Sequence, residues 1–217
     1  LKYKGKEIAN HRNINDDNQT LRHPEIKTQA HSVESGTNTG APSKEEKIID
    51  KVKYKNLIIG KKYKVTGVLM DKDKNKPILD KDDKEITAEK EFTAENADGE
   101  TELEFRYDSS LRQNKVTVVF ETLTYRNVPV AVHADINDSA QSICYPAIGT
   151  KMTGNGGAKV VPKAKNVPLV DTVKYENLIS GRIYTVKGVL MDKKTSKPYE
   201  EDGKVVTGST TFTSGGN

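Results

Sequence analysis

Residues 101–108 read TELEFRYD, and this alternating stretch decides the fold class of the chain. Leu103, Phe105 and Tyr107 share one face of an extended backbone, while the charged side chains between them share the other face. The stretch KKYKVTGVL at residues 61–69 alternates in the same way, with small or apolar residues on one face. The stretch KVTVVFETL at residues 115–123 is apolar on both faces, as expected of a central strand. With Gly, Asn and Pro in the turns, these short strands predict an all-β fold built as an antiparallel β-sandwich.

Two long internal repeats organise the chain. LKYKGKEIANHRNINDDNQTL at residues 1–21 aligns with LTYRNVPVAVHADINDSAQSI at residues 123–143. DKVKYKNLIIGKKYKVTGVLMDK at residues 50–72 aligns with DTVKYENLISGRIYTVKGVLMDK at residues 171–193. Such self-similarity at a fixed spacing is the signature of tandem modules.

The repeats predict three parts. The N-terminal segment (residues 1–22) is the closing-strand segment of a preceding module. The complete module spans residues 23–145. The C-terminal segment (residues 146–217) is the N-terminal part of a following module.

Composition excludes several classes of function. The net charge of +4 comes from interleaved basic and acidic residues, so the electrostatic footprint expected of a nucleic-acid-binding protein is missing. No apolar run approaches the ~18 residues of a membrane span, and we expect no membrane insertion. The single cysteine, Cys144, cannot form an internal disulfide, and no pair of residues has metal-ligand spacing. We therefore expect neither a metal nor a cofactor.

The chain starts at Leu1 without a signal peptide, which suggests a window from a longer protein.

One acidic stretch resembles the start of a calcium-binding loop. DKDKNKPILDKDD begins at Asp71, but it lacks glycine at its sixth position and has Asp82 instead of glutamate at its twelfth. A hairpin loop is the better interpretation.

Alternation also places reactive polar side chains on apolar faces. Each lies two positions from an apolar residue and so points to the same face of its strand. The set is Thr28, Asp50, Glu121 and Gln141 in the complete module, and Gln19, Thr150 and Asp171 in the partial ones. His133 belongs to the same region, although its neighbours define no clear apolar face. A buried carboxylate must pair or bind a proton. Hydrogen bonds from loop backbones would explain any one of these residues, but they explain the whole set less well.

This set of residues favours one particular reaction. A threonine hydroxyl becomes nucleophilic when a base takes its proton, and His133, oriented by a carboxylate, could be that base. Two acids forced together share a proton, so that Asp50 or Glu121 would stay neutral and could polarise a carboxamide. Attack of Thr28 on Gln141 would expel ammonia and leave an ester between the first and last strands.

The stretches IKT, IDKVKY, VVFE and HADINDSAQ together resemble the Thr–Gln ester-bond domains (VaFE repeats) of Gram-positive surface adhesins. The resemblance implies that Thr28 and Gln141 are cross-linked, that His133 is the base and that Asp50 and Glu121 are the acid pair. It also implies that His11, Gln19, Thr150 and Asp171 are their counterparts in the partial modules. Asn13 stands where the complete module has Asp135, which argues against a catalytic role for Asp135. Neither partial module holds all five residues, so the chain would close one bond unaided.

The resemblance further implies tandem immunoglobulin-like (CnaB-like) β-sandwich modules in the stalk of an adhesin. Such a protein is extracellular and is anchored to the cell wall at the bacterial cell surface. Its partners would be neighbouring modules of the same chain, and the sequence names no host ligand. The cross-link would form once and autocatalytically, without the turnover of an enzyme.

Two alternatives remain open. The first is a stalk module with a Lys–Asn isopeptide bond. Lys27 is the candidate lysine, but strand alternation places its side chain on the solvent face. The second is a ligand-binding adhesin β-domain, for which Tyr63, Tyr107 and Tyr125 would offer stacking surfaces. A hydrolase is less well supported, since nothing in the sequence marks a substrate cleft.

Overall fold

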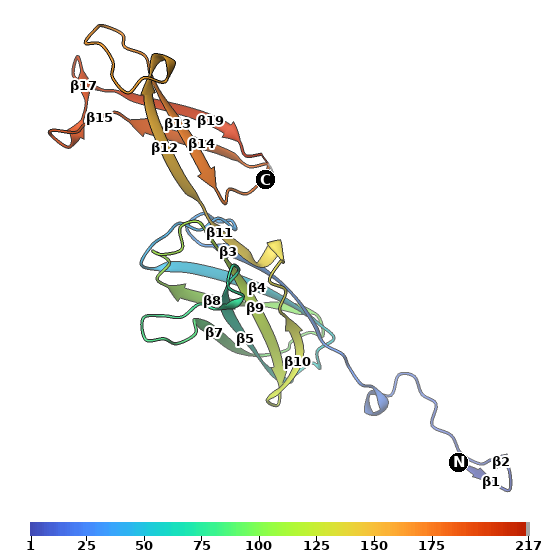
Figure 1. Ribbon diagram of the computed structural model, residues 1–217. Coiled ribbons are helices and arrows are strands. Elements are labelled where there is room, and N and C mark those ends of the chain that lie inside the picture. Colours follow the sequence, from blue (N-terminus) through green and yellow to red (C-terminus); the bar gives the residue numbers. More distant parts are fainter. Residues whose placement is uncertain (216–217) are drawn as a thin grey trace.

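The computed structural model describes residues 1–215, and it is built almost entirely from antiparallel strands (Figure 1). The prediction of an all-β fold is therefore confirmed. The N-terminal segment projects from one end of the sandwich, and the C-terminal segment continues from the other end (Figure 1). No helix among the described residues is long and apolar enough to cross a membrane.

One sheet of the complete module has three strands in the order β3-β4-β8, with bounds Glu25–Ser32, Glu46–Lys55 and Gly99–Tyr107. Buried and outward-facing side chains alternate along all three strands, as the sequence predicts. Ion pairs lie on the outer face, for example Lys47 Nζ to Glu104 Oε2 at 2.6 Å.

The facing sheet surrounds β9 (Lys115–Tyr125). Its other strands are β5 (Lys62–Asp71), β6 (Lys76–Pro77), β7 (Thr87–Thr93), β10 (Val128–His133) and β11 (Ser142–Tyr145). Strand β9 pairs with β5 on one side and with β10 and β11 on the other. The stretch that is apolar on both faces is therefore a central strand.

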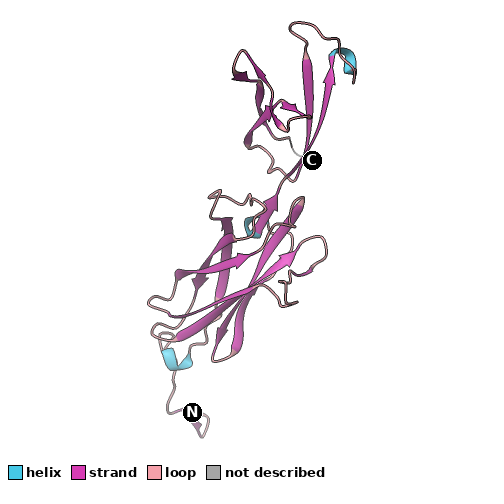
Figure 2. Ribbon diagram, turned by 90° about the vertical axis from the view of Figure 1, so that its left-hand side faces the viewer, coloured by secondary structure: helices cyan, strands magenta, loops and turns pink. Residues whose placement is uncertain are grey.

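The strands of the two sheets can be followed in Figure 2. The hydrophobic core takes its residues from both sheets. Leu103 and Phe105 from one sheet meet Leu69 and Val119 from the other, and all four side chains are at most 1% exposed. Burying a side chain of this size contributes about 1.5–3 kcal/mol. The close approach of the sheets requires Gly67 on β5, because a Cβ atom there would lie 2.6 Å from Phe105 Cζ.

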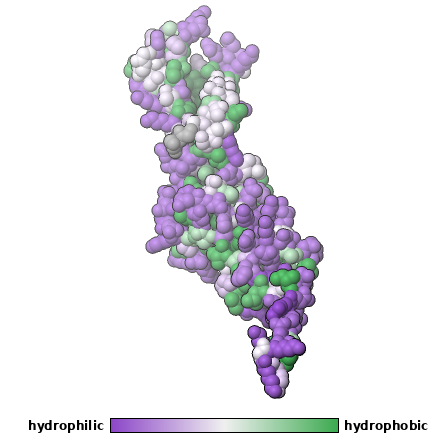
Figure 3. Space-filling model, turned by 90° about the vertical axis from the view of Figure 1, so that its right-hand side faces the viewer, coloured by the Kyte–Doolittle hydropathy of each residue, from purple (hydrophilic) through white to green (hydrophobic). Residues whose placement is uncertain are grey.

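The N-terminal segment contains the two-residue strands β1 (Lys2–Tyr3) and β2 (Lys6–Glu7) and the 3-10 helix η1 (Asp17–Gln19). These two strands pair with each other, and Leu1, Ile14 and Leu21 in this segment are more than four-fifths exposed. Elsewhere the face shown in Figure 3 is mostly hydrophilic, with small apolar areas scattered along its length.

The C-terminal segment repeats the first strands of the complete module. It contains β12 (Ala147–Gly154), η3 (Asn155–Gly157), β13 (Leu169–Glu176), β14 (Ile183–Val189), β15 (Met191–Asp192), β16 (Lys197–Pro198), β17 (Glu200–Glu201), β18 (Lys204–Val205) and β19 (Thr207–Thr213). Strands β12 and β13 pair in the register of β3 and β4: Thr150 lies opposite Val173, as Thr28 lies opposite Val52.

The acidic stretch after Asp71 forms hairpin turns. Asp71 Oδ1 accepts hydrogen bonds from the backbone N–H groups of Asp73 and Lys74, and Oδ2 accepts one from Arg112 at 2.7 Å. Asp80 caps the next turn by accepting from Asp82 N at 2.8 Å. Within residues 1–215, no group of three or more His, Cys, Asp or Glu side chains is arranged to hold a metal ion.

Candidate cross-linking site

Thr28 lies at the centre of a buried polar cluster between the two sheets. Its side chain points inward from β3, and the residue is 8% exposed. Thr28 Oγ1 lies 2.8 Å from Nδ1 of His133 and 3.1 Å from Oε2 of Glu121. It also contacts the carboxamide of Gln141 at Nε2. The threonine hydroxyl thus meets a base, an acid and a carboxamide at once.

Gln141 is fully buried, but it does not lie in a strand. It ends the 3-10 helix η2 (Ser139–Gln141), which leads directly into β11. The expectation of a link between the first and last strands therefore needs correction, because the glutamine precedes the last strand by one residue. The 3-10 turn brings its side chain back across the sandwich toward β3. Gln141 Nε2 also lies 3.4 Å from Oδ1 of Asp50.

Asp50 and Glu121 form a pair of acids from opposite sheets. Asp50 points inward from β4 and Glu121 from β9, and they are 0% and 1% exposed. Burial, reinforced by the neighbouring Asp50 carboxylate, raises the pKa of Glu121 to about 11. Burial also raises the pKa of Asp50, although its contacts with Glu121 and Gln141 oppose that shift. Glu121 is therefore protonated at neutral pH.

Three oxygens of this cluster are buried and have no hydrogen-bond partner at ordinary distance among the described residues: Asp50 Oδ2, Glu121 Oε1 and Gln141 Oε1. Buried acceptors without a donor are costly. One proton shared between the two carboxyl groups would satisfy the two carboxyl oxygens. The unpartnered Gln141 Oε1 is the oxygen that gains charge if the carboxamide is attacked.

His133 is held from both sides of its ring. It ends β10 directly opposite Glu121, and its side chain is 23% exposed. Nδ1 faces Thr28, while Nε2 lies 3.1 Å from Oδ2 of Asp138. A carboxylate that accepts the Nε2 proton leaves Nδ1 free to accept the threonine proton.

Asp138 is a candidate positioning residue that the sequence analysis missed. It caps η2 by accepting a hydrogen bond from Ala140 N at 2.8 Å while its other oxygen faces His133. The N-terminal segment repeats this arrangement, with His11 Nε2 lying 2.7 Å from Asp16 Oδ2. The signal was present in the sequence, since both repeats have an aspartate five residues after the histidine.

Asp135 has a different environment. Its Oδ1 accepts a hydrogen bond from Asn137 N at 2.9 Å, and Asn13 Oδ1 accepts the equivalent bond from Asn15 N at 3.0 Å. The position needs an oxygen that stabilises a turn, and aspartate and asparagine both provide one. This environment explains why the two repeats differ there.

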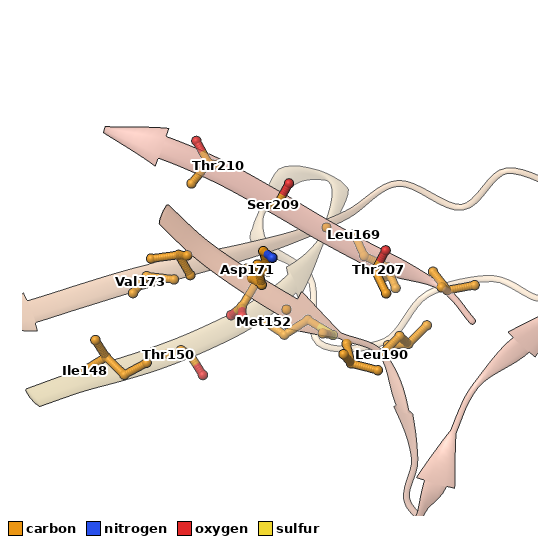
Figure 4. Close-up of a pocket in the computed structure, with 16 residues that line it drawn as sticks. Ile148, Thr150, Met152, Leu169, Asp171, Val173, Leu190, Thr207, Ser209 and Thr210 are labelled. Atoms are coloured by element: carbon orange, nitrogen blue, oxygen red, sulfur yellow. The ribbon is translucent and has the colours of Figure 1, made fainter. Parts of the chain in front are cut away.

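The four residues of the two partial modules do not form one site. Thr150 and Asp171 are exposed and line an open groove of about 420 Å³ on the C-terminal segment (Figure 4). His11 and Gln19 lie in the N-terminal segment at the opposite end of the molecule (Figure 1). The five residue types therefore meet in the complete module, while the partial modules hold two each.

The residues of the alternative functions lie elsewhere. Lys27 is on the exposed face of β3, opposite Lys53. Tyr63 and Tyr107 are 3% and 7% exposed within the core, and Tyr125 packs against Tyr63 with ring centroids 5.1 Å apart. Tyr63 and Tyr107 are therefore core residues, while Tyr125 is partly exposed.

Comparison with known families covers the chain in three consecutive pieces. Residues 1–23, 24–145 and 146–217 each match the family described as "T-Q ester bond containing domain". The chain belongs to this family. Within the matched piece 24–145, the side chains of Thr28 and Gln141 are in contact.

Two solved structures similar to this chain are crystal forms of a bacterial adhesin from Mobiluncus mulieris containing intramolecular disulfide, isopeptide and ester bond cross-links. The P1 form is 15% identical over 90% of this chain and 94% of that chain, with a TM-score of 0.46. The P21 form is 16% identical over 89% and 100%, with a TM-score of 0.49. A putative beta-galactosidase from Bacteroides fragilis is 10% identical over 52% and 17%, with a TM-score of 0.38. None of the curated proteins compared with the chain is a detectable relative.

Proposed function

We propose that residues 23–145 form a self-cross-linking stalk module of a bacterial surface adhesin, closed by an ester between Thr28 and Gln141. One observation carries the proposal: the Thr28 hydroxyl contacts the Gln141 carboxamide while lying 2.8 Å from the imidazole of His133. The membership of the chain in the T-Q ester bond family supports the same chemistry.

The first step forms the carbon–oxygen bond. His133 Nδ1 takes the proton of Thr28, and Oγ1 attacks Cδ of Gln141. Asp138 stabilises the imidazolium that results, because its carboxylate lies 3.1 Å from Nε2. Negative charge develops on Gln141 Oε1. Turning the carboxamide end for end directs Oε1 toward the acid pair, where the protonated Glu121 can donate to it.

The second step expels ammonia. The imidazolium returns its proton to the Gln141 nitrogen, the Cδ–Nε2 bond breaks, and NH3 leaves. The product is an ester from Thr28 Oγ1 to Gln141 Cδ, with His133 neutral again and Glu121 still protonated. The glutamine is consumed, so the reaction occurs once per chain and is not enzymatic turnover. Thr28 and Gln141 are 8% and 0% exposed, and the packed sandwich limits access of water that would hydrolyse the ester.

The position of the bond suits a load-bearing module. Thr28 lies on the first strand of the module, and Gln141 immediately precedes the last. Force applied to the ends of the module would pull these two elements apart. A covalent bond between them carries that load instead of the hydrogen bonds of the sheet edge.

The wider setting is part of the proposal. The three segments would be the end of one module, one complete module and the start of another, each partnered by its neighbours in the chain. The location at the bacterial cell surface, the anchoring to the cell wall and the immunoglobulin-like (CnaB-like) topology remain predictions.

Mass spectrometry of the purified chain tests the proposal. The parent should weigh one ammonia less than its sequence requires, and Thr28→Ala should have its full mass. Lys27→Ala is the matched control, because an isopeptide bond at Lys27 would also expel ammonia. In the denatured protein, where the reagent can reach the bond, hydroxylamine should cleave an ester and spare an isopeptide. A parent of full mass, or one whose cross-link resists hydroxylamine, would overturn the ester.

A further inference from the structure

Side-chain hydrogen bonds join the complete module to the C-terminal segment. Asn114, in the turn before β9, accepts a hydrogen bond at Oδ1 from Asn177 Nδ2 at 2.8 Å, and its own Nδ2 donates to Glu176 Oε2. On the other side of the junction, Arg182 Nη2 donates to Asn38 Oδ1 at 2.8 Å. The contacts come from two separate loops of the complete module, so they resist both bending and twisting.

The covalent link between the two parts is short and stiff. Strand β11 ends at Tyr145 and β12 begins at Ala147, which leaves Pro146 as the whole linker. A proline ring holds φ near −65°, so this linker has little freedom. The carbonyl of Tyr145 is itself held, because it accepts a hydrogen bond from Asn114 N at 2.9 Å. Asn114 thus contacts the end of one part and the start of the next.

Apolar packing does not set this junction. The buried hydrophobic cluster draws all its members from residues 26–145. The orientation of the C-terminal segment therefore depends on Pro146 and on the polar contacts around it.

The same features recur at the start of the complete module. Pro24 stands between His23 and β3, as Pro146 stands between Tyr145 and β12. Asn56 matches Asn177 in the repeat and has the same left-handed backbone, with φ of 61° and 55°. Asn56 Nδ2 donates to the backbone carbonyl of His23 at 3.2 Å.

We propose that Asn38 and Asn114 form an end face that locks onto the start face of the next module, represented here by Asn177 and Arg182. The partner of this surface is the next copy of the module in the same chain. By the repeat, Asn56 and Lys61 form the equivalent start face of the complete module and receive two loop carboxamides from the module before it. The junction makes a tandem array of such modules a stiff rod. The role of the junction in a rod rests on the proposed stalk function. The contacts that form the junction do not depend on the ester.

Residual dipolar couplings of the full chain in solution test the lock. One alignment tensor should describe both residues 25–145 and residues 147–213. The double variant Asn114→Gly with Arg182→Gln should lose this common tensor, while the amide chemical shifts inside each part stay those of the parent. Glycine is chosen because Asn114 has a φ of 60°, which glycine tolerates without strain.

The matched control is Asn127→Gly. Asn127 is also an exposed turn asparagine with a φ of 62°, but it lies in the β9–β10 hairpin away from the junction. This variant should keep the common tensor. Separate tensors in the parent, or a common tensor in the double variant, would overturn the lock.

The mass of the same samples separates this inference from the proposed function. Thr28→Ala should lose the cross-link and keep the common tensor. A common tensor in a parent that has lost no ammonia would refute the ester and leave the junction standing.

Discussion

At the residue scale, the chemistry of the site depends on which nitrogen of His133 carries the proton. In the proposed reaction, Nδ1 accepts the proton of Thr28, so Nε2 must carry the hydrogen of the neutral ring. Asp138 is the group that accepts a hydrogen bond from Nε2. The same carboxylate would stabilise the imidazolium during the reaction. Asp138 is therefore expected to act through His133, as a positioning residue, without touching the reacting atoms.

Asp138→Asn tests this role. Asparagine still caps η2, but it removes the negative charge beside Nε2 and can stabilise the wrong tautomer. We expect ester formation to slow by about 10²–10⁴-fold, the usual contribution of general acid–base catalysis. The measurement is the rate of ammonia loss after refolding, followed by intact mass. Asp135→Asn is the control and should react at the parent's rate, since asparagine occupies that position in the N-terminal segment. Equal rates for the two variants would contradict the role of Asp138.

The raised pKa values of Asp50 and Glu121 predict how the stability of the protein without its cross-link depends on pH. The pKa of Glu121 is raised from 4.5 to about 11 in the folded protein, and that of Asp50 is raised as well. The folded state therefore binds more protons than the unfolded state between these pH values. The resulting stabilisation is fully present below about pH 4.5 and is lost as the pH rises toward 11.

Thr28→Ala makes this effect measurable, because it cannot form the cross-link and keeps both acids. Its melting temperature should fall as the pH is raised from mildly acidic to alkaline values. Adding Glu121→Gln should flatten the dependence, since glutamine cannot bind the proton. A melting curve equally steep with glutamine at position 121 would mean that other groups cause the dependence.

Much of this site could be predicted because strand alternation assigns faces. Thr28, Asp50 and Glu121 lie in regular strands, and their parity places them inward, where the structure has them. Asp138 caps the 3-10 helix η2 and lies outside any strand, so alternation says nothing about its direction. The two-residue alternation of a strand also predicts that Gln141 lies in the interior, as it does. It cannot predict the 3-10 helix that holds Gln141 there.

At the scale of elements, the sheets follow from local pattern, and their spacing follows from one small residue. The central position of β9 could be predicted because a strand covered on both faces needs apolar residues on both. The close packing of β5 against β8 is not visible in the pattern of either strand alone. It depends on Gly67, where a Cβ atom would lie 2.8 Å from Leu103 Cδ1 as well as against Phe105.

Gly67→Val should therefore destabilise the complete module. Overpacking a filled core typically costs about 1–3 kcal/mol, and the melting temperature should drop by several degrees. The repeat supplies the control, Gly188→Val, because a Cβ atom at Gly188 meets only Gly208 O at 3.9 Å. That exposed substitution should change stability by no more than about 0.5 kcal/mol. Thermal melting followed by circular dichroism compares the two. A Gly67→Val effect as small as that expected for Gly188→Val would show that the core accepts the larger side chain without cost.

At the scale of the whole molecule, the repeats predict the order of the segments but not their relative orientation. The orientation depends on loop side chains such as Asn114 and Arg182, whose partners are distant in sequence and follow no period. Pro146 can be read from the sequence. That it is the whole linker follows only from the structure, in which β11 ends at Tyr145 and β12 begins at Ala147. The proposed cross-link and the proposed junction would thus have complementary roles, one within a module and one between modules.

The cross-link should dominate the stability of the complete module. The proposed ester would close a loop between residues 113 positions apart. By analogy with disulfides, a loop of roughly this length gains about 4–5 kcal/mol from the reduced entropy of the unfolded chain. Thr28→Ala should therefore lower the melting temperature by much more than an ordinary threonine substitution.

Thr101→Ala is the matched control. Thr101 is also 8% exposed and loses the same atoms on substitution, but it has no part in the proposed cross-link. Its cost should be near the usual ~1 kcal/mol of a point substitution. If the two variants melt together, below the parent by the same amount, no covalent bond at Thr28 stabilises the module.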